Sequence, residues 1–232
     1  MSEQDDIKRA AAEKAVELVQ DGMLLGLGSG STANYFTEGV GRLVAEGMKV
    51  RGVPTSRATA ELAAARGIQI VTELIGQIDL TVDGADEVEQ SLNLIKGRGG
   101  ALFREKVVAA ASKRFVVVVD ESKVVKQLGV GVLPVEILPY LWRSTADRVA
   151  SVATSLTVRG GEEAPYITDN GNMIVDLMIE GGIADPPGLA RELKAMTGVV
   201  EHGLFIGLTD TVIVGGPDGS LVVGRLSGGA VA

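Results

Sequence analysis

The stretch that decides the fold runs from residue 23 to residue 32 and reads MLLGLGSGST. Met23 to Leu27 is continuously apolar and predicts a short buried strand. The glycines that follow predict a loop, and the loop opens a helix from Ala33 to about Glu46. An apolar strand joined to a helix by a short loop is typical of a parallel sheet, whose strands are buried on both faces.

The same alternation continues on both sides of this stretch. A helix opens at Asp5 and Asp6, and further strands and helices follow in turn. The strands are predicted at 48–53, 68–71, 78–82, 92–95 and 115–119, and the helices at 57–66 and 102–111. This pattern predicts an α/β fold with a parallel, Rossmann-like sheet and helices on both faces. We expect each unusual loop to follow the carboxyl end of one of these strands, where such sheets place their chemistry.

The pattern changes near residues 128–134. Beyond this point, strands at 133–138, 156–159 and 172–178 alternate with helices at 141–153 and 187–196, which predicts a smaller α+β domain. Residues 168–171 (TDNG) predict a hairpin turn. Two strands after Gly203, at 211–215 and 221–225, are joined by Pro217-Asp218-Gly219, and periodicity alone does not place them.

Composition excludes several classes of function. The 232 residues include 30 acidic and 22 basic side chains, and the net charge of −8 disfavours nucleic acid and anionic membranes. A chain without cysteine has no disulfide and no catalytic thiol, and its single histidine, His202, excludes a multi-histidine metal site. We see no apolar N-terminal segment and no run of 18 apolar residues, so we expect a cytoplasmic protein.

The loop from Gly26 to Thr32 has the chemistry of an anion site. Glycines allow a close approach of the backbone, and a helix N-terminus with Ser31 and Thr32 supplies hydrogen-bond donors. The alternative is a tight turn in which Ser or Thr caps the helix. A dinucleotide site fits poorly, because the second strand ends at residues 53–56 (VPTS) without a carboxylate. A P-loop is excluded, since no Gly-Lys-Ser/Thr follows.

Three more loops carry charged residues at predicted strand ends. Asp83 and Asp86 can bind sugar hydroxyls or a divalent metal, or they can belong to a turn before a helix. Lys96 can neutralise an oxyanion, and Glu105 can transfer a proton, although Glu105 and Lys106 can also be ordinary surface charges. Lys123 can reach a phosphate, or it can be a solvated lysine.

Together these segments resemble ribose-5-phosphate isomerase of the A type, in order along nearly the whole chain. The matching segments are GLGSGST (26–32), DGADE (83–87), KGRGGAL (96–102), REK (104–106), DESK (120–123), LPVE (133–136), TDNGN (168–172), GVV (198–200), GLF (203–205) and PDG (217–219).

The resemblance implies interconversion of D-ribose 5-phosphate and D-ribulose 5-phosphate in the non-oxidative branch of the pentose phosphate pathway. It implies an enediolate intermediate and neither a metal nor an organic cofactor. Glu105 is then the catalytic base, Asp83 and Asp86 serve ring opening and the sugar hydroxyls, and Lys96 stabilises the enediolate oxygen. The residues expected to bind substrate are Ser29, Gly30, Ser31, Thr32, Asp83, Gly84, Ala85, Asp86, Lys96, Gly97, Arg98, Gly99, Lys123 and Lys8, with the phosphate chiefly on Ser31, Thr32 and Lys123.

The family fold implies a catalytic α/β domain at residues 1–130 and 204–232, with the last strands returning to the first domain. The smaller domain then covers 131–203 and contributes to a homodimer or homotetramer. Arg98 departs from the family loop, where glycine is commoner. An extra cation beside Lys96 can tune substrate binding, or its side chain can point to solvent, and we expect the second. We expect the catalytic residues and the phosphate-binding residues to face one common cleft.

Two other functions remain as alternatives. A sugar-phosphate sensor, like the effector domains of some bacterial repressors, would bind the same ligand without turnover. A nicotinamide-dependent oxidoreductase would use the glycine loop for its cofactor.

Overall fold

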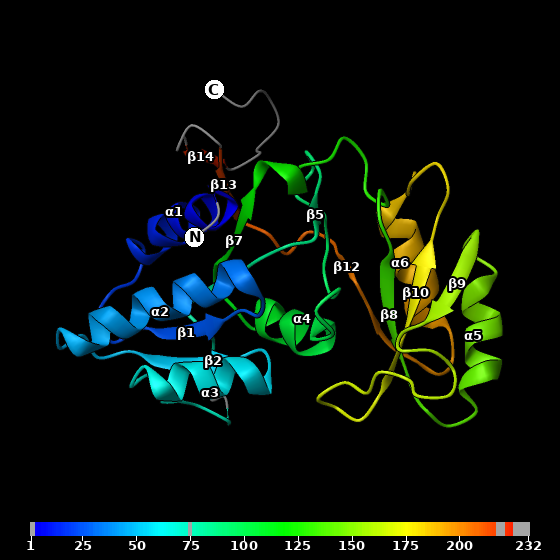
Figure 1. Ribbon diagram of the computed structural model, residues 1–232, viewed down its shortest axis with the longest axis horizontal. Coiled ribbons are helices and arrows are strands. Elements are labelled where there is room, and N and C mark those ends of the chain that lie inside the picture. The colour runs from blue at the N-terminus through cyan, green and yellow to red at the C-terminus, as the bar shows by residue number, and fades with distance from the viewer. Residues whose placement is uncertain (1–2, 74–75, 217–220, 225–232) are drawn as a thin grey trace. The chain divides into compact units, whose positions relative to one another are not determined.

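The computed structural model (Figure 1) describes residues 3–73, 76–216 and 221–224. The chain forms two compact units, each with its own buried hydrophobic cluster. Unit 1 comprises Met1–Ala85, Arg104–Val124 and Leu208–Ala232, and unit 2 comprises Asp86–Phe103 and Val125–Gly207.

Unit 1 is built on a seven-stranded sheet with the strand order β14-β13-β7-β4-β1-β2-β3. The six strands from β13 to β3 run parallel, and β14 pairs antiparallel with β13 at the edge. The strands are β1 (Leu24–Leu27), β2 (Arg51–Pro54), β3 (Gln69–Ile70), β4 (Leu80–Asp83), β7 (Phe115–Asp120), β13 (Thr211–Gly215) and β14 (Leu221–Gly224). The prediction of a parallel, Rossmann-like sheet is confirmed.

Helices cover both faces of this sheet (Figure 1). Leu25 and Leu27 of β1 belong to one cluster with residues of α1, α2 and α3. Leu24 packs instead with Val108 of α4. Because neighbouring residues in a strand point to opposite faces, α1 to α3 lie on one face and α4 on the other. The bounds are α1 (Glu3–Val16), α2 (Ser31–Ala45), α3 (Arg57–Ala65) and α4 (Leu102–Ala110).

The strands form where the sequence is apolar and β-branched. In β7, FVVVVD, all six residues are buried, as expected for a strand with helices on both sides. β13 lies parallel to β7 and returns the chain to unit 1, as the family resemblance implies. The turn predicted at 217–219 and the last residue of the predicted final strand, Arg225, lie outside the described residues.

Unit 2 has two antiparallel sheets, with strand orders β11-β8-β10-β9 and β12-β6-β5. Val149 of α5 and Leu193 of α6 share a buried cluster with strand residues such as Val135 and Val175. The predicted α+β character of the smaller domain is confirmed. The elements are β5 (Glu87–Val88), β6 (Leu94–Ile95), β8 (Leu133–Ile137), α5 (Trp142–Ala150), β9 (Ser155–Val158), β10 (Met173–Met178), α6 (Pro186–Ala195), β11 (Val199–His202) and β12 (Leu204–Phe205).

The predicted turn at 168–171 is present. The Thr168 N–H donates to the Asn172 carbonyl, and the Gly171 N–H donates to the Thr168 carbonyl, each at 2.9 Å. Ile167 and Met173 pair antiparallel on either side. The hairpin prediction is therefore confirmed.

The strand predicted at 92–95 is present in part, but the prediction that it joins the parallel sheet was wrong. Residues 94–95 form β6, which pairs antiparallel with β5 and β12 in unit 2 instead of joining the parallel sheet. The turn between β5 and β6 depends on Leu92, whose φ is 61° and whose N–H donates to the Glu89 carbonyl. The left-handed position of this turn holds a leucine where glycine or asparagine is usual, so the sequence lacks the residue that normally marks such a position.

This hairpin also changes the division of the chain. Residues 86–103, which we expected in the first domain, group with residues 125–207 in unit 2. The chain therefore passes between the units after Ala85, Phe103, Val124 and Gly207.

Within the part of the chain that the structure describes, none of the helices has the length and apolar character needed to span a membrane.

Asp79 lies directly before β4, at the edge of the sheet where the parallel strands begin. Its Oδ2 accepts a hydrogen bond from the Leu24 N–H (2.9 Å), and its Oδ1 accepts one from Lys113 Nζ (2.7 Å). The Leu24 N–H is the main cause that lowers the pKa of Asp79, and Lys113 adds to it. The folded protein therefore holds this proton more weakly than the unfolded chain does. The gain in stability is present above the unfolded pKa of 3.8 and is lost as the pH falls through the lower folded pKa.

We therefore expect Asp79→Asn to lower the free energy of unfolding by about 1 kcal/mol near neutral pH, since about a third of the side chain is exposed and the charge is screened. The difference from the unmodified chain should shrink towards zero in strong acid. Urea unfolding of both chains at neutral and acidic pH measures this, and an equal difference at both pH values would contradict it.

Candidate active site

The strand order places a switch point between β1 and β4 in unit 1. From β1 the chain proceeds to β2 and β3 on one side, and from β4 it proceeds to β7 and β13 on the other. In open α/β sheets, ligands bind at the carboxyl ends of the strands beside such a point. The loops after β1, β2, β4 and β7 all begin at this edge.

Asp83 ends β4 at the switch point and is buried, with 1% of the residue exposed. Its Oδ1 accepts hydrogen bonds from the backbone N–H groups of Ser29 (3.0 Å) and Gly84 (2.7 Å). Gly28 permits this approach, because a Cβ there would lie 2.3 Å from Asp83 Oδ1. The loop after β1 and the carboxylate after β4 thus form one structural group.

Ser29 also belongs to a cluster of four hydroxyl groups. Its Oγ lies 2.7 Å from Thr55 Oγ1, 2.8 Å from Ser56 Oγ and 3.1 Å from Thr59 Oγ1. Thr59 in turn donates to the Gly28 carbonyl at 3.0 Å. These hydrogen bonds give the Ser29 hydroxyl a role in holding the loop, and its contact with substrate stays a prediction.

Sequence reasoning missed the three partners of Ser29 in this cluster. In the sequence, residues 53–56 indicate only that the second strand ends without a carboxylate. The signal that could have found them is the start of α3, where Ser56 is the N-cap and accepts from the Thr59 N–H. Because β2 lies beside β1, this cap reaches the loop after β1.

The N-terminus of α2 carries the predicted phosphate-binding residues. The N-cap is Gly30, with a φ of 98°, and no side chain caps this end. Ser31 and Thr32 lie inside the first turn, so the alternative in which Ser or Thr caps the helix is wrong. Uncapped N–H groups and the helix dipole favour a bound anion at this end.

Lys123 follows the carboxyl end of β7. It closes the short 3₁₀ helix η1 (Glu121–Lys123) and is half-buried. The residue before this helix, Asp120, accepts hydrogen bonds at Oδ1 from the N–H (3.0 Å) and the hydroxyl of Ser122. Asp120 therefore shapes the turn that presents Lys123.

Lys8 lies on α1 and is half-buried. Its neighbour Ile7 is so close to Gly215, the last residue of β13, that a Cβ on Gly215 would lie 2.9 Å from Ile7 Cγ2. Lys8 is thus placed near the carboxyl end of β13, at the same edge of the sheet as Lys123.

α4 brings Glu105 towards this edge as well. Val108 packs against Leu24 of β1, and Ser112, just past the helix, is hydrogen-bonded to Thr81 of β4. Glu105 lies one turn before Val108 on the same side of the helix, and so nearer the carboxyl ends of the strands. With 5% of Glu105 exposed, the alternative of an ordinary surface charge is wrong for this residue.

Asp86 and Lys96 come together in unit 2, on the β5–β6 hairpin. The Asp86 N–H donates to the Ile95 carbonyl at 2.9 Å, which places Asp86 opposite the end of β6. Lys96 follows directly and is 3% exposed, with Nζ 5.6 Å from the centroid of the Phe205 ring. An ammonium group in such surroundings acts on a nearby anion with little screening by water.

The expectation that Arg98 points to solvent was wrong. Its Nη2 donates to Oε1 of Glu87 at 2.5 Å, and Glu87 is 2% exposed. The same carboxylate accepts hydrogen bonds from the N–H groups of Gly129 (2.7 Å), Val130 (3.2 Å) and Gly131 (2.7 Å). A buried carboxylate needs a cation or several donors, and this need turns Arg98 inward.

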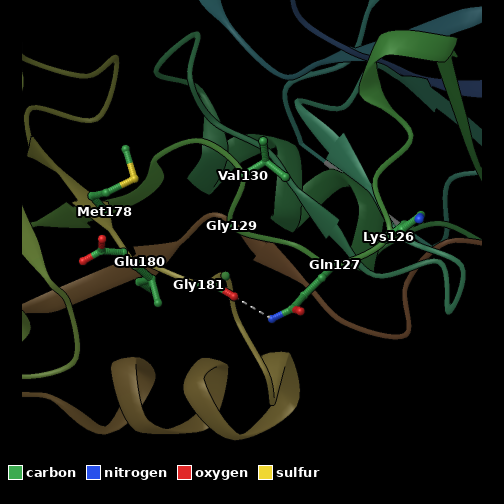
Figure 2. A pocket seen from close by; sticks show the side chains of 9 residues that line it. Lys126, Gln127, Gly129, Val130, Met178, Glu180 and Gly181 are labelled. Atoms are coloured by element: carbon green, nitrogen blue, oxygen red, sulfur yellow. Dashed lines mark hydrogen bonds between the residues drawn. The ribbon is translucent and has the colours of Figure 1, made fainter.

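A separate hollow in unit 2 has a volume of about 400 Å³ (Figure 2). Its walls come from residues between Lys126 and Val130 and between Met178 and Gly182. Gln127 Nε2 donates across it to the Gly181 carbonyl at 3.3 Å. The lining of the hollow contains none of the predicted site residues.

Among the described residues, no three or more His, Cys, Asp or Glu side chains gather in a way that could hold a metal ion. The metal alternative for Asp83 and Asp86 therefore gains no support from their surroundings.

The structure groups the predicted residues in two sets. Unit 1 brings together the residues after β1, Asp83, Glu105, Lys123 and Lys8, and unit 2 brings together Asp86, Lys96 and the glycine loop after it. The expectation that both sets face one cleft stays a prediction.

Comparison with known proteins matches most of the chain to one family. Residues 51–219 match the family model described as ribose 5-phosphate isomerase A (phosphoriboisomerase A). Ribose-5-phosphate isomerase A 1 of Oceanobacillus iheyensis is 47% identical over 94% of this chain and 98% of its own length.

Solved structures agree in fold over almost the whole chain. Ribose 5-phosphate isomerase A of Methanocaldococcus jannaschii is 40% identical, with a TM-score of 0.90 over 96% of this chain and 99% of its own. A D-ribose-5-phosphate isomerase in complex with phospho-erythronic acid is 37% identical, with a TM-score of 0.91 over 97% of this chain and 100% of its own.

Proposed function

The chain belongs to the ribose 5-phosphate isomerase A family, and from this premise we propose how its residues interconvert D-ribose 5-phosphate and D-ribulose 5-phosphate. The interconversion moves one hydrogen between C1 and C2 of the open-chain sugar and one between O1 and O2. The atoms of substrate and product are the same, so the protein needs only to move protons and to stabilise a transient negative charge.

Glu105 is the base in this proposal. Its carboxylate removes the proton from C2 of ribose 5-phosphate, and the electrons form an enediolate across C1 and C2. Glu105 then returns the proton to C1, while the hydrogen on O2 passes to O1, and the ketose results. A buried carboxylate suits this role because, screened from water, it can keep the proton it has taken and give it back.

Asp83, Asp86 and Lys96 assist at the sugar oxygens. We assign ring opening and the binding of hydroxyl groups to the two aspartates, and stabilisation of the enediolate oxygen to the Lys96 ammonium group. A fixed cation near a developing oxyanion acts strongly because it does not have to reorient during the reaction.

The phosphate lies, in this proposal, at the N-terminus of α2. Ser31 and Thr32 donate from the first turn, with Gly30 and Ser29 in the loop before it and the ammonium groups of Lys123 and Lys8 at the same sheet edge. Helix N–H groups and lysines together bind phosphate without a metal. Gly84, Ala85, Gly97, Arg98 and Gly99 line the substrate through their backbone.

One observation carries the proposal: Glu105 is a buried carboxylate in the first turn of a helix that leads to the sheet edge where Asp83 lies. An ordinary helix places a glutamate of the first turn in solvent. Burial of a carboxylate costs free energy, and such a cost is typical of a functional group.

The test is direct. Purified protein treated with a chelator is mixed with ribose 5-phosphate, and ketose formation is followed. We expect turnover without added metal. Recovery of activity only on addition of a metal would contradict the proposal of cofactor-free chemistry. Binding without turnover would indicate the sensor, and NAD-dependent absorbance changes with a polyol would indicate the oxidoreductase.

Assembly as a homodimer or homotetramer and a cytoplasmic location remain predictions.

A further inference from the structure

Arg159 follows β9 and forms a bridge inside unit 2. Its Nε donates to Asp176 Oδ2 at 2.9 Å, and its Nη2 pairs with Asp176 Oδ1. Its Nη1 donates to the carbonyl oxygens of Gly97 and Arg98, at 3.0 Å each. One guanidinium group thus joins a carboxylate on β10 to two consecutive carbonyl groups of the loop at residues 96–100, here named the lysine loop.

The lysine loop carries or contacts the two residues of unit 2 that act in the proposed reaction, Lys96 and Asp86. It begins with Lys96, and the Arg98 N–H donates to Asp86 Oδ2 at 2.9 Å. The peptide group between Gly97 and Arg98 therefore contacts Arg159 through its oxygen and Asp86 through its nitrogen. Any shift of this peptide moves the Asp86 carboxylate and the start of the Lys96 side chain together.

Packing limits the other end of the loop. Gly100 has a φ of 90°, and a Cβ there would lie 2.3 Å from Tyr166 Oη. The Tyr166 N–H donates to the Arg159 carbonyl at 2.7 Å, and the Arg159 guanidinium lies 6.0 Å from the centroid of the Tyr166 ring. Arg159 therefore organises both the loop and the aromatic ring beside it.

The pair of Arg159 and Asp176 is only 17% and 15% exposed. Such burial costs desolvation, and a simple cross-strand pair recovers little of it. The two hydrogen bonds to the lysine loop use donors that a simple pair would leave unused. Only a planar guanidinium group can serve the carboxylate and both carbonyls at once.

We propose that Arg159, oriented by Asp176, is a positioning residue that holds the lysine loop and thereby sets Lys96 and Asp86 for the reaction. The catalytic consequence rests on the proposed function, whereas the holding of the loop does not. Arg159 itself contacts no reacting atom in this proposal.

The experiment compares Arg159→Met, Arg159→Lys and the matched control Val175→Ala. Val175 is fully buried on β10 beside Asp176, so the control weakens the same sheet and keeps both Arg159 and Asp176. Steady-state rates with ribose 5-phosphate are measured per folded molecule, and amide hydrogen exchange is measured over residues 96–100. The exchange measurement needs no activity.

We expect both Arg159 variants to lower kcat by about 100-fold, the usual loss when a reacting group is misplaced by about 1 Å, with a much smaller change in KM. We expect exchange in the lysine loop to rise about tenfold or more. Lysine should fail to restore either value, because a single ammonium group cannot replace the guanidinium fork. Val175→Ala should leave kcat and loop exchange as they are.

Unchanged exchange in Arg159→Met would overturn the proposal, and so would full recovery of kcat in Arg159→Lys. Faster exchange with an unchanged kcat would also overturn the positioning role. If the unmodified chain does not turn over ribose 5-phosphate, the proposed function fails instead, and the exchange measurement still decides whether Arg159 holds the loop.

Discussion

Glu105→Gln should lower kcat for ribose 5-phosphate by roughly two to four orders of magnitude, the usual contribution of a general base. Glutamine has the shape of glutamate and can keep hydrogen bonds in the buried first turn of α4, but its amide cannot accept a proton from carbon. The variant should therefore fold and bind, and lose chiefly the chemical step.

Two measurements separate these effects. Initial rates give kcat and KM, and titration with phospho-erythronic acid, the ligand in a solved relative, reports binding. Glu61→Gln, an exposed glutamate on α3, is the matched control and should keep full activity. Unchanged turnover in Glu105→Gln would remove Glu105 from its assigned role, and loss of binding alone would assign it to substrate recognition.

Lys96→Met should lower kcat by about two to three orders of magnitude, the range seen when a donor to a developing oxyanion is removed. Methionine fills nearly the same volume beside Phe205 but carries no charge. The enediolate oxygen would then form without its cation, so the transition state loses more than the bound substrate does. We expect kcat to fall far more than KM rises.

Lys126→Met gives the matched control, because Lys126 is an exposed lysine of the same unit. Rates are measured for both variants per folded molecule, with folding checked by circular dichroism. A rise in KM with an unchanged kcat would show that Lys96 binds substrate and transition state equally, which would contradict its role at the enediolate.

Much of unit 1 could be predicted from local sequence. The run at 23–32 specifies a strand, a loop and a helix start within ten residues, and the apolar run at 115–119 becomes the fully buried β7. These features depend on neighbours along the chain, since hydrogen bonding in a helix and side-chain alternation in a strand are local. The candidate residues at strand ends followed from the same logic.

The hairpin of β5 and β6 could not be predicted in this way. Leu92 adopts a left-handed conformation that leucine rarely takes, and it is buried, with 8% of the residue exposed. Consequently the sequence reasoning put the strand before Lys96 in the parallel sheet, although Lys96 itself was identified by its charge and by the glycines after it.

The partners of the Arg98 and Arg159 side chains could not be predicted from the sequence either. Arg98 turns inward because Glu87 is buried, and Arg159 meets the lysine loop about sixty residues away in sequence. Periodicity does not report such pairs, because their energies depend on which charges the fold removes from water.

By itself, then, the sequence determined the kind of sheet, most of its strands and helices, and the residue types available for proton transfer and phosphate binding, because these depend on local patterns. Only the tertiary structure decided which buried charges pair, how Ser29 is held by the hydroxyl groups of Thr55, Ser56 and Thr59, and how Arg159 reaches the lysine loop. Those contacts join segments distant in sequence, and they exist only after the chain has folded.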